Sequence, residues 1–266
     1  MPEMLEIEAY RRAAERVIGR QIARVHAPDA WYLKEGLTAP VLRKAVEGRT
    51  VSCLRRRGKL LLVDTDDPDA DHQGPTIGLR FGMTGRLLVD GAPGVEHLEY
   101  SSMRENPDWD RLVFRFDGGG ELRIRDPRRL GGVLLDPEED RLGPDALDLT
   151  PAQLRDLMLR SRAPVKARLM DQSVVAGIGN LLVDEALWRA GIDPARESRS
   201  LTPNEMRRLH KHLRATLVEL GARGGSHTGD LQDERRRDGV CPKDGTPLLR
   251  RQVGGRTTYS CPLHQV

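Results

Sequence analysis

The stretch at residues 171–194, DQSVVAGIGNLLVDEALWRAGIDP, constrains the fold of this chain more than any other. It predicts a helix, a sharp turn at Gly177 and Gly179, and a second helix that starts at Asn180. The start of a helix presents unpaired N–H groups and a partial positive charge, which suits a phosphate. Asn180 could cap that helix or donate its amide to an anion. On spacing alone, an ordinary helical hairpin with a glycine cap is the simpler interpretation.

The order of these residues closely resembles the helix–two-turn–helix of the formamidopyrimidine-DNA glycosylase/endonuclease VIII family of base-excision repair enzymes. The resemblance implies that Asn180 and the turn before it hold a DNA phosphate beside the damaged nucleotide. It also implies an α+β multidomain fold. That fold has an N-terminal β-sandwich with an N-terminal helix, a helical domain with the helix–two-turn–helix, and a C-terminal zinc-ribbon-like β-hairpin.

Composition permits this architecture without demanding it. A chain of 266 residues, 38% hydrophobic and 31% charged, is long enough for two or three globular domains. The net charge of +3 tolerates nucleic acid. No apolar run is long enough to span a membrane, and the acidic start MPEMLEIE does not resemble a signal peptide. We therefore expect a cytoplasmic monomer without membrane contact, nucleoid-associated when bound to DNA, and no disulfide framework from its three cysteines.

Pro2 and Glu3 offer a route to covalent catalysis. Removal of Met1 would leave Pro2 as a free secondary amine, and an α-amino group titrates at about pH 8, so part of it is neutral near neutral pH. A neutral amine can attack the sugar C1′ of a nucleotide, and the cationic iminium that forms acidifies the neighbouring C2′ proton. Without further context, Pro and Glu would simply begin a helix.

The N-terminal segment P-E-M-L-E-I-E resembles the family's P-E-L-P-E-V-E. The resemblance implies that Pro2 is the nucleophile and that Glu3 protonates the sugar ring oxygen and shuttles protons. Glu6 would orient the amine, and Leu5 stands where the family often has proline. An amphipathic helix that packs on a core is predicted by apolar residues at helical spacing, namely Ile7, Tyr10, Ala14, Val17 and Ile18.

Short apolar runs between turn residues dominate residues 51–135 and predict the β-sandwich. We expect strands at residues 49–54, 59–64, 76–81, 86–89, 112–116 and 121–124. The sequence DGGGE predicts a hairpin connection between the last two. Residues 64–75 are acidic and rich in turn formers, which indicates a surface loop. Cys53 falls within a strand, and we interpret it as a core residue.

Three motifs in the sandwich resemble DNA-contacting motifs of the family. R-R-G-K at residues 56–59 implies that Lys59 contacts a phosphate at the lesion, although alone it would be a solvated turn. G-M-T-G at residues 82–85 implies that Met83 enters the gap left by a flipped base. D-P-R-R-L-G at residues 126–131 implies that Arg128 addresses the orphaned opposite base. Leu130 replaces a phenylalanine, which keeps an apolar wedge but leaves opposite-base preference open.

We expect a catalytic domain at residues 1–135, an acidic linker at 136–150, a helix–two-turn–helix domain at 151–223, and a mobile loop with a zinc-finger-like hairpin at 224–266. Thr150 and Thr202 each begin a capping box with proline at the first helical position. The second of these helices is expected to run to about Leu220. Residues 221–239 have no hydrophobic period and are expected to be mobile. Purine-specific family members carry a longer loop there, so lesion preference stays open.

Four potential metal ligands lie near the end of the chain, in the pattern C-P-K-D-(x16)-C-P-L-H. In the family four cysteines occupy these positions, a strong zinc-ribbon pattern. Asp and His also ligate zinc, so we predict a structural zinc ion and no organic cofactor. The alternative is a plain turn at Asp244 in a metal-free ribbon. The predicted ligands are Cys241, Asp244, Cys261 and His264.

The hairpin between the two halves of this pattern, G-G-R-T-T-Y, resembles the family's G-R-[ST]-T-Y. The resemblance implies that Arg256 grips the phosphates that flank the lesion. Lys59, Asn180 and Arg256 would then converge on one DNA backbone in a cleft between domains.

Taken together, these features predict a bifunctional DNA glycosylase and AP lyase that acts on damaged double-stranded DNA. It would excise an oxidised purine or pyrimidine and cut the strand by β- and δ-elimination. One alternative is a catalytically silent protein that binds damaged DNA, against which Pro2 and Glu3 argue. Another is a small-molecule enzyme with Pro2 as a general base, which leaves the other motifs unexplained.

Overall fold

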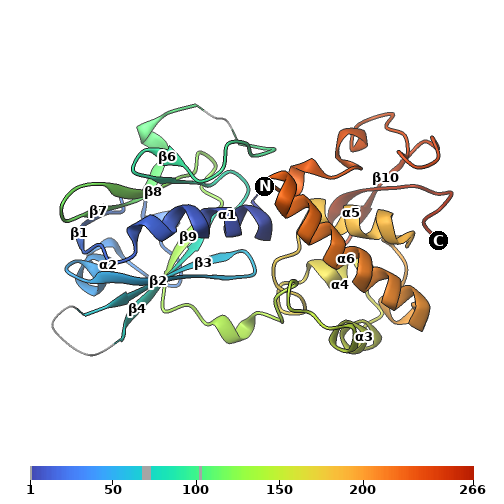
Figure 1. Cartoon of the computed structure of the whole chain (residues 1–266), viewed down its shortest axis with the longest axis horizontal. Coiled ribbons are helices and arrows are strands. Elements are labelled where there is room, and N and C mark those ends of the chain that lie inside the picture. Colours follow the sequence, from blue (N-terminus) through green and yellow to red (C-terminus); the bar gives the residue numbers. More distant parts are fainter. Residues whose placement is uncertain (1, 68–72, 102–103) are drawn as a thin grey trace. The chain divides into compact units, whose positions relative to one another are not determined.

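The computed structural model describes residues 2–67, 73–101 and 104–266, and the chain forms two compact units, Met1–Glu139 and Asp140–Val266 (Figure 1). Met1, whose removal the chemistry requires, lies outside the described residues. So do residues 68–72 of the predicted acidic loop. The strands on either side extend further than predicted, so the loop is shorter than residues 64–75.

Two antiparallel sheets build the first unit. One has the strand order β1-β7-β8-β5-β6 and the other β2-β3-β4-β9. Their bounds are β1 Ile22–His26, β2 Thr50–Arg57, β3 Leu60–Asp66, β4 Gln73–Arg80, β5 Arg86–Val89, β6 Ala92–Pro93, β7 Asp110–Phe116, β8 Glu121–Arg125 and β9 Gly132–Leu135. All six predicted strands are therefore present, and β1, β6 and β9 are added to them.

One apolar core joins the two sheets, which confirms the β-sandwich. Its members include Val63 and Ile77 from one sheet and Phe114 and Ile124 from the other, all fully buried. Helices α1 (Met4–Ala14) and α2 (Ala39–Val46) add their apolar faces to the same core. The N-terminal helix is thus held by Ile7, Tyr10 and Ala14, as its periodicity predicts.

Two residues of this unit are not where the sequence predicts them. Cys53 lies in β2 but is exposed, because the register between β2 and β3 shifts between Val51 and Cys53. Such a bulge reverses the alternation of faces, so Leu54 points into the core instead. Ile18 is 45% exposed, since α1 ends at Ala14 and a short 3₁₀ turn (Glu15–Val17) carries the chain off the helical face.

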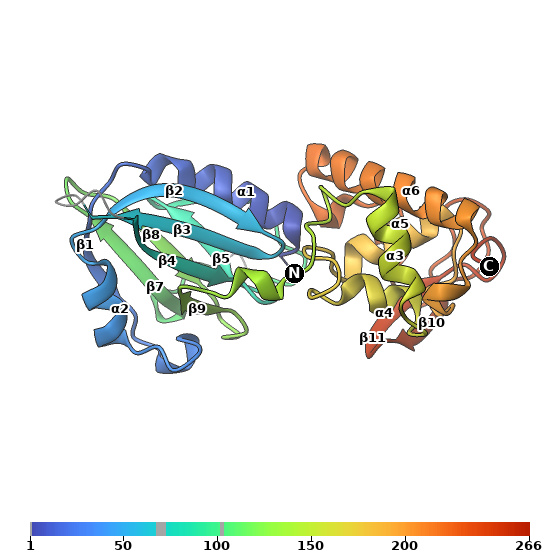
Figure 2. The same cartoon turned by 90° about the horizontal axis from the view of Figure 1, so that it is seen from below.

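The second unit contains four helices and a two-stranded hairpin. These are α3 Pro151–Leu159, α4 Val165–Met170, α5 Asn180–Ala190, α6 Pro203–Arg223, β10 Leu249–Val253 and β11 Arg256–Ser260 (Figure 2). The capping boxes at Thr150 and Thr202 are confirmed, each with proline at the start of the helix. In the described part of the chain no helix is long and apolar enough to cross a membrane.

The prediction of a helix at the start of residues 171–194 is wrong. Helix α4 ends at Met170, and two turns lead to Gly179, the N-cap of α5. The Asp171 carboxylate accepts a hydrogen bond from the Ser173 N–H at 2.9 Å, a local bond that competes with helix formation. Gly177 has a φ of 109°, whereas Gly179 is extended, so only the first glycine needs its conformational freedom.

Residues 221–239, which are predicted to be mobile, contact α5. Helix α6 continues to Arg223, and two 3₁₀ turns follow, Ser226–Thr228 and Gln232–Glu234. Leu231 is fully buried. The Glu185 carboxylate of α5 accepts hydrogen bonds from the backbone N–H groups of Asp230 (3.1 Å) and Leu231 (2.9 Å). Leu231 and the Glu185 carboxylate thus attach this segment to α5, although its sequence has no hydrophobic periodicity.

Candidate nucleic-acid interface and metal centre

The start of α1 brings together the three predicted catalytic residues of the N-terminus. Pro2, Glu3 and Glu6 are all buried. The Glu6 carboxylate accepts a hydrogen bond from the backbone N–H of Glu3 at 2.7 Å and closes a capping box around the first turn. Glu6 therefore fixes the backbone next to Pro2, which fits an orienting role better than a direct one.

Tyr10 connects this helix to the loop that carries Met83. Its hydroxyl donates a hydrogen bond to the Gly85 oxygen at 3.1 Å, and its ring lies 4.6 Å from that of Phe81 between centroids. Burial raises the pKa of Tyr10 far above its usual value, so the hydroxyl keeps its proton and remains a donor. Tyr10 thus packs the helix that follows Pro2 against the loop that carries Met83.

The structure also brings together the two loops predicted to fill the gap left by a flipped base. Gly82 has a φ of 58°, and a Cβ there would lie 2.4 Å from the carbonyl carbon of Leu130. Only glycine permits this close approach. Met83 is half-buried, whereas Arg128 and Leu130 are exposed, so the tip of the second loop offers its cation and its apolar side chain to solvent.

Asp126 links these two loops through its carboxylate, which is fully buried. Oδ1 accepts hydrogen bonds from the Thr84 hydroxyl at 2.5 Å and the Arg128 N–H at 3.2 Å. Oδ2 accepts one from the Gly131 N–H at 2.9 Å. Hydrogen bonds to a buried carboxylate are stronger than those between neutral groups. Asp126 therefore fixes the relative position of the loops that carry Met83 and Leu130.

The second arginine of the D-P-R-R motif forms an ion pair within the unit and remains half exposed. Arg129 has a φ of 55° and donates two hydrogen bonds of 2.6 Å to the Asp29 carboxylate. Burial alone would raise the pKa of Asp29, but the hydrogen bonds from Arg129 outweigh it and lower that pKa. Arg129 therefore anchors the loop, and the exposed Arg128 is the candidate for the predicted contact with the opposite base.

Lys59 lies in the two-residue turn between β2 and β3. Gly58 supplies the left-handed φ of 57° that so tight a turn requires. The Arg56 guanidinium donates hydrogen bonds to the Gly58 oxygen at 3.0 Å and to the Glu8 carboxylate of α1 at 3.3 Å. The tip of this hairpin and the first turn of α1 lie at the same end of the unit (Figure 2).

In the second unit, Asn180 is linked to the hairpin of Arg256. Its side-chain amide donates a hydrogen bond to the Thr257 oxygen at 3.2 Å. The hairpin turn at Gly254 and Gly255 takes positive φ angles, and a Cβ at Gly254 would lie 2.7 Å from the Cβ of Ala167 in α4. The exposed Arg256 is thus presented by a turn that rests on a helix.

A buried ion pair also holds this hairpin in place. Lys166 and Asp184 are fully buried and lie 2.7 Å apart, and Arg235 also pairs with Asp184. The Lys166 ammonium donates to the Thr258 hydroxyl at 2.7 Å and to the Thr257 oxygen at 3.3 Å. Lys166 therefore meets the same carbonyl oxygen as Asn180 and fixes α5 against β11.

The four predicted metal ligands form one cluster, with their ligand atoms all within 4.8 Å of one another. The separations are 3.6 Å from Cys241 Sγ to His264 Nδ1, 3.4 Å from Cys261 Sγ to Asp244 Oδ2, and 2.9 Å from His264 Nδ1 to Asp244 Oδ2. Ligand atoms on one tetrahedral zinc ion lie about 3.3–3.8 Å apart. The donor set therefore fits a divalent metal, and the two separations that involve a cysteine sulfur match this spacing. The 2.9 Å between His264 and Asp244 is shorter, as in a hydrogen bond.

Neighbouring groups prepare this cluster for a metal. His264 Nε2 lies 3.2 Å from the Trp188 oxygen, so a ring proton on Nε2 would have an acceptor when Nδ1 binds a metal. Hydrogen bonds, first from Thr246 and also from His264 and Cys261, hold the pKa of Asp244 far below its usual value. Asp244 is therefore an ionised carboxylate, the form that binds a metal.

Sequence reasoning missed three positioning residues of these sites, namely Asp126, Lys166 and Gln172. Gln172 bridges the two turns: its amide donates to the oxygens of Met170 (2.8 Å) and Ile178 (3.0 Å), and its Oε1 accepts from the Gly177 N–H (3.0 Å). Asp126 and Gln172 stand inside the motifs that were recognised. Lys166 gave only the weak signal of a lysine at the start of a helix.

The chain combines a β-sandwich and its N-terminal helix with a helix–two-turn–helix and a Cys-Asp-Cys-His hairpin. This architecture defines a multidomain protein of the α+β class. The chain belongs to the formamidopyrimidine-DNA glycosylase family. The family's N-terminal domain model matches residues 1–133, and its H2TH domain model matches residues 142–230.

Individual relatives cover the whole chain. The formamidopyrimidine-DNA glycosylase of Paracoccus denitrificans is 38% identical over 294 residues and is covered completely, as is this chain. That of Symbiobacterium thermophilum is 36% identical over 295 residues, across 100% of this chain and 89% of the relative. Two solved structures of Lactococcus lactis Fpg, with abasic-site DNA and with FAPY-dG DNA, each align with a TM-score of 0.81 and 26% identity over 99% of both chains.

Proposed function

We propose that this protein is a bifunctional DNA glycosylase and AP lyase of base-excision repair, which removes an oxidised base from double-stranded DNA. The observation that carries the proposal is the start of α1, where Pro2 and Glu3 are buried side by side in the chain and the Glu6 carboxylate fixes the Glu3 backbone at 2.7 Å. The relatives' shared name and the damaged DNA bound to the Lactococcus lactis protein support the class of substrate.

The chemistry follows from a secondary amine at the chain start. Pro2, freed of Met1, attacks C1′ while the bond from C1′ to the base breaks. The base leaves with that electron pair and takes up the proton that the proline nitrogen loses. Glu3 protonates the ring oxygen O4′, which opens the sugar and leaves an iminium between the proline nitrogen and C1′. The iminium accepts electrons from the C2′–H bond. Loss of this proton expels the 3′ phosphate, and a second elimination releases the 5′ phosphate.

Six further residues have proposed roles at the DNA. Met83 and Leu130 fill the gap left by the extruded nucleotide, and Arg128 meets the opposite base. Lys59, Asn180 and Arg256 bind backbone phosphates, which adds affinity without sequence information. Lys59 belongs to the first unit and the other two to the second, so their convergence on one backbone remains part of the proposal.

We propose zinc as the metal of the Cys241, Asp244, Cys261 and His264 cluster. Four protein ligands leave no open position, so the ion would be structural and would keep the hairpin of Arg256 closed. The reaction is left to Pro2 and Glu3. Because one chain carries every proposed group, we further propose a monomer that acts on nucleoid DNA in the cytoplasm.

Incision of a panel of duplexes tests this function. Each duplex carries one oxidised purine or one oxidised pyrimidine, and we expect the protein to cut at the lesion and leave phosphate on both ends. The lesion that is cut fastest defines the substrate preference. Glu3→Gln should bind the same duplex but not cut it. If protein with a free Pro2 binds these duplexes without cutting any of them, the silent damage-binding alternative is correct instead.

A further inference from the structure

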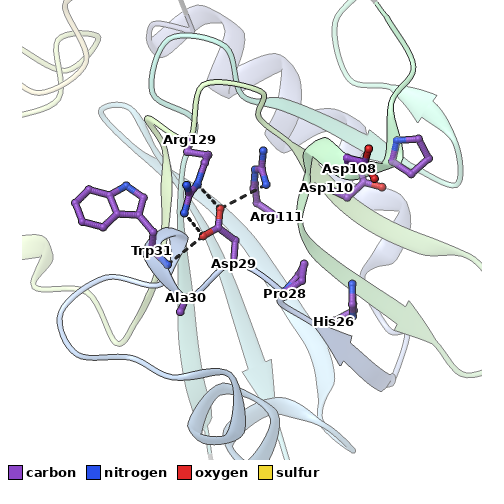
Figure 3. A pocket seen from close by; sticks show the side chains of 10 residues that line it. His26, Pro28, Asp29, Ala30, Trp31, Asp108, Asp110, Arg111 and Arg129 are labelled. Carbon is purple, nitrogen blue, oxygen red and sulfur yellow. Dashed lines mark hydrogen bonds and ion pairs between the residues drawn. The ribbon is translucent and has the colours of Figure 1, made fainter.

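A groove in the first unit has no role in the function proposed above. Its volume is about 760 Å³, and it is lined by parts of residues 26–31 and 107–111 together with Arg129. Trp31 and Arg129 stand at one end, and Asp108 and Asp110 at the other (Figure 3). Arg129 is the neighbour of both Arg128 and Leu130, so the groove begins directly behind the loop proposed to enter the DNA.

Trp31 is the most exposed large apolar side chain in the described part of the protein, at 68%. Its backbone is fixed, because its N–H donates to Asp29 Oδ1 at 3.1 Å and its oxygen accepts from Lys34 Nζ at 2.7 Å. The same ammonium lies 4.9 Å from the centre of the indole ring. A large aromatic surface held in place but left in water is suited to stack against another flat ring.

The charges around Trp31 favour an anion at that end of the groove. The Asp29 carboxylate faces two guanidinium groups, Arg129 at 2.6 Å and Arg111 at 3.5 Å, and Lys34 adds a third cation. The opposite end carries Asp108, which is exposed. A ligand that fits this groove therefore has one flat ring with a negative charge close to it. Further negative charges along the groove would be unfavourable.

We propose that the groove binds one unpaired nucleotide of the undamaged DNA strand, with its base stacked on Trp31 and its phosphate beside Arg129 and Lys34. This inference rests on the proposed function, because Arg128 assigns the neighbouring loop to the strand opposite the lesion. The volume is within the range of small-ligand sites. The acidic end at Asp108 limits the site to a single nucleotide, since a continuing phosphate chain would be repelled there. The protein thereby gains affinity for lesions next to unpaired bases.

Two duplexes with a tetrahydrofuran abasic analogue test the proposal by equilibrium binding. One is fully paired, and the other has two unpaired nucleotides in the complementary strand beside the position opposite the analogue. Trp31→Ala should weaken binding of the second duplex by about tenfold, the scale of one lost base–aromatic stack. It should leave the affinity for the paired duplex unchanged. Trp31→Phe keeps a stacking ring and should bind both duplexes like the wild type.

Val41→Ala is the matched control, because Val41 is an exposed apolar residue of α2 outside the groove. Equal weakening of both duplexes by Trp31→Ala, or weakening of neither, overturns the proposal. A short single-stranded oligonucleotide provides a probe that needs no lesion recognition. Trp31→Ala should weaken its binding as well, and unchanged binding rejects the groove. Failure of the proposed glycosylase function would be seen in a different measurement, because the wild type would then not cut damaged DNA.

Discussion

The side-chain amide of Asn180 donates a hydrogen bond to the main-chain oxygen of Thr257, 3.2 Å away. This bond joins the first residue of α5 to the strand that begins with Arg256. Lys166 donates to the same oxygen at 3.3 Å, from a position buried against Asp184. The two residues of this unit proposed to bind phosphate are therefore held by one carbonyl group, although 75 intervening residues separate them.

Arg256→Ala should weaken DNA binding and reduce its dependence on salt. Each phosphate neutralised by a cation contributes a slope of about −0.9 to the plot of log affinity against log salt, so the slope should become shallower by about that amount. Asn180→Ala should weaken binding with little change of slope, because a neutral amide displaces no counterion. Titrations at several salt concentrations measure both values. A slope unchanged by Arg256→Ala contradicts the assignment of Arg256 to a phosphate.

Asp126→Asn should loosen the two loops that meet at this carboxylate. The amide has one acceptor oxygen where three donors converge, so at least one buried N–H or O–H loses its partner. We expect the free energy of unfolding to fall by about 1–3 kcal/mol. Incision should also discriminate less between the bases opposite the lesion.

Thr84→Val is the comparison for Asp126→Asn, since it removes only one of these hydrogen bonds and should cost about 1 kcal/mol. Urea unfolding measures the stability of both variants, and incision of duplexes with each of the four opposite bases measures discrimination. If Asp126→Asn is less stable but discriminates like the wild type, Asp126 has no part in positioning Arg128 and Leu130.

Metal analysis of the purified protein should find about one zinc ion per chain. His264→Ala and Asp244→Ala each remove one ligand and should lower the zinc content and the melting temperature. Asp244→Cys replaces a carboxylate with a softer ligand and should retain the metal. Cys53→Ala is the control, because Cys53 is exposed in the other unit and should leave the zinc content unchanged. Equal zinc contents in wild type and His264→Ala would exclude this site.

Glu205 should make the second unit less stable in acid. The Arg196 guanidinium, with the hydrogen bonds from Thr202, lowers the pKa of Glu205 from 4.5 to about 2. A carboxyl group with a lowered pKa in the folded state stabilises the protein above its unfolded pKa, and this contribution disappears as the pH falls through the folded pKa. Glu205→Gln keeps the capping pattern but removes the charge.

The free energy of unfolding of Glu205→Gln should therefore lie below that of the wild type at neutral pH, by less than about 1 kcal/mol because the pair is partly solvated. The difference should shrink as the pH falls from 4.5 towards about 2. Urea unfolding of both proteins across this range checks the trend. A difference that stays constant with pH would mean that the Arg196–Glu205 pair contributes nothing.

Features that depend on neighbours in the chain could be predicted from the sequence. The capping boxes at Thr150 and Thr202 involve residues three positions apart, and the strands follow from alternating apolar residues. The exposed position of Cys53 could not be predicted, because one bulge in β2 reverses the faces of the strand after it. The two turns before α5 could not be predicted either, since they are stabilised by side-chain hydrogen bonds of Asp171 and Gln172.

The cluster of potential metal ligands could be predicted because its spacing in the sequence is characteristic, and the structure brings the candidate ligand atoms within 4.8 Å of one another. The residues that position the sites could not. Asp126 acts on Thr84 from 42 positions away, and Lys166 acts on Thr258 from 92 positions away. Contacts between residues so far apart in the chain leave no local pattern in the sequence from which they could be predicted. Pro2 could be interpreted only through the resemblance of its segment, since an N-terminal proline has no distinctive environment in the sequence alone.

Borohydride trapping with abasic-site DNA, followed by mass spectrometry of the cross-linked peptide, tests the central claim most directly. The reductant converts an iminium into a stable amine, so the nucleophile stays attached to the sugar. We predict a covalent adduct on the nitrogen of Pro2, in protein that has lost Met1, and no adduct when Met1 is retained. An adduct on a lysine such as Lys59, or strand cleavage by protein that still carries Met1, would contradict this mechanism.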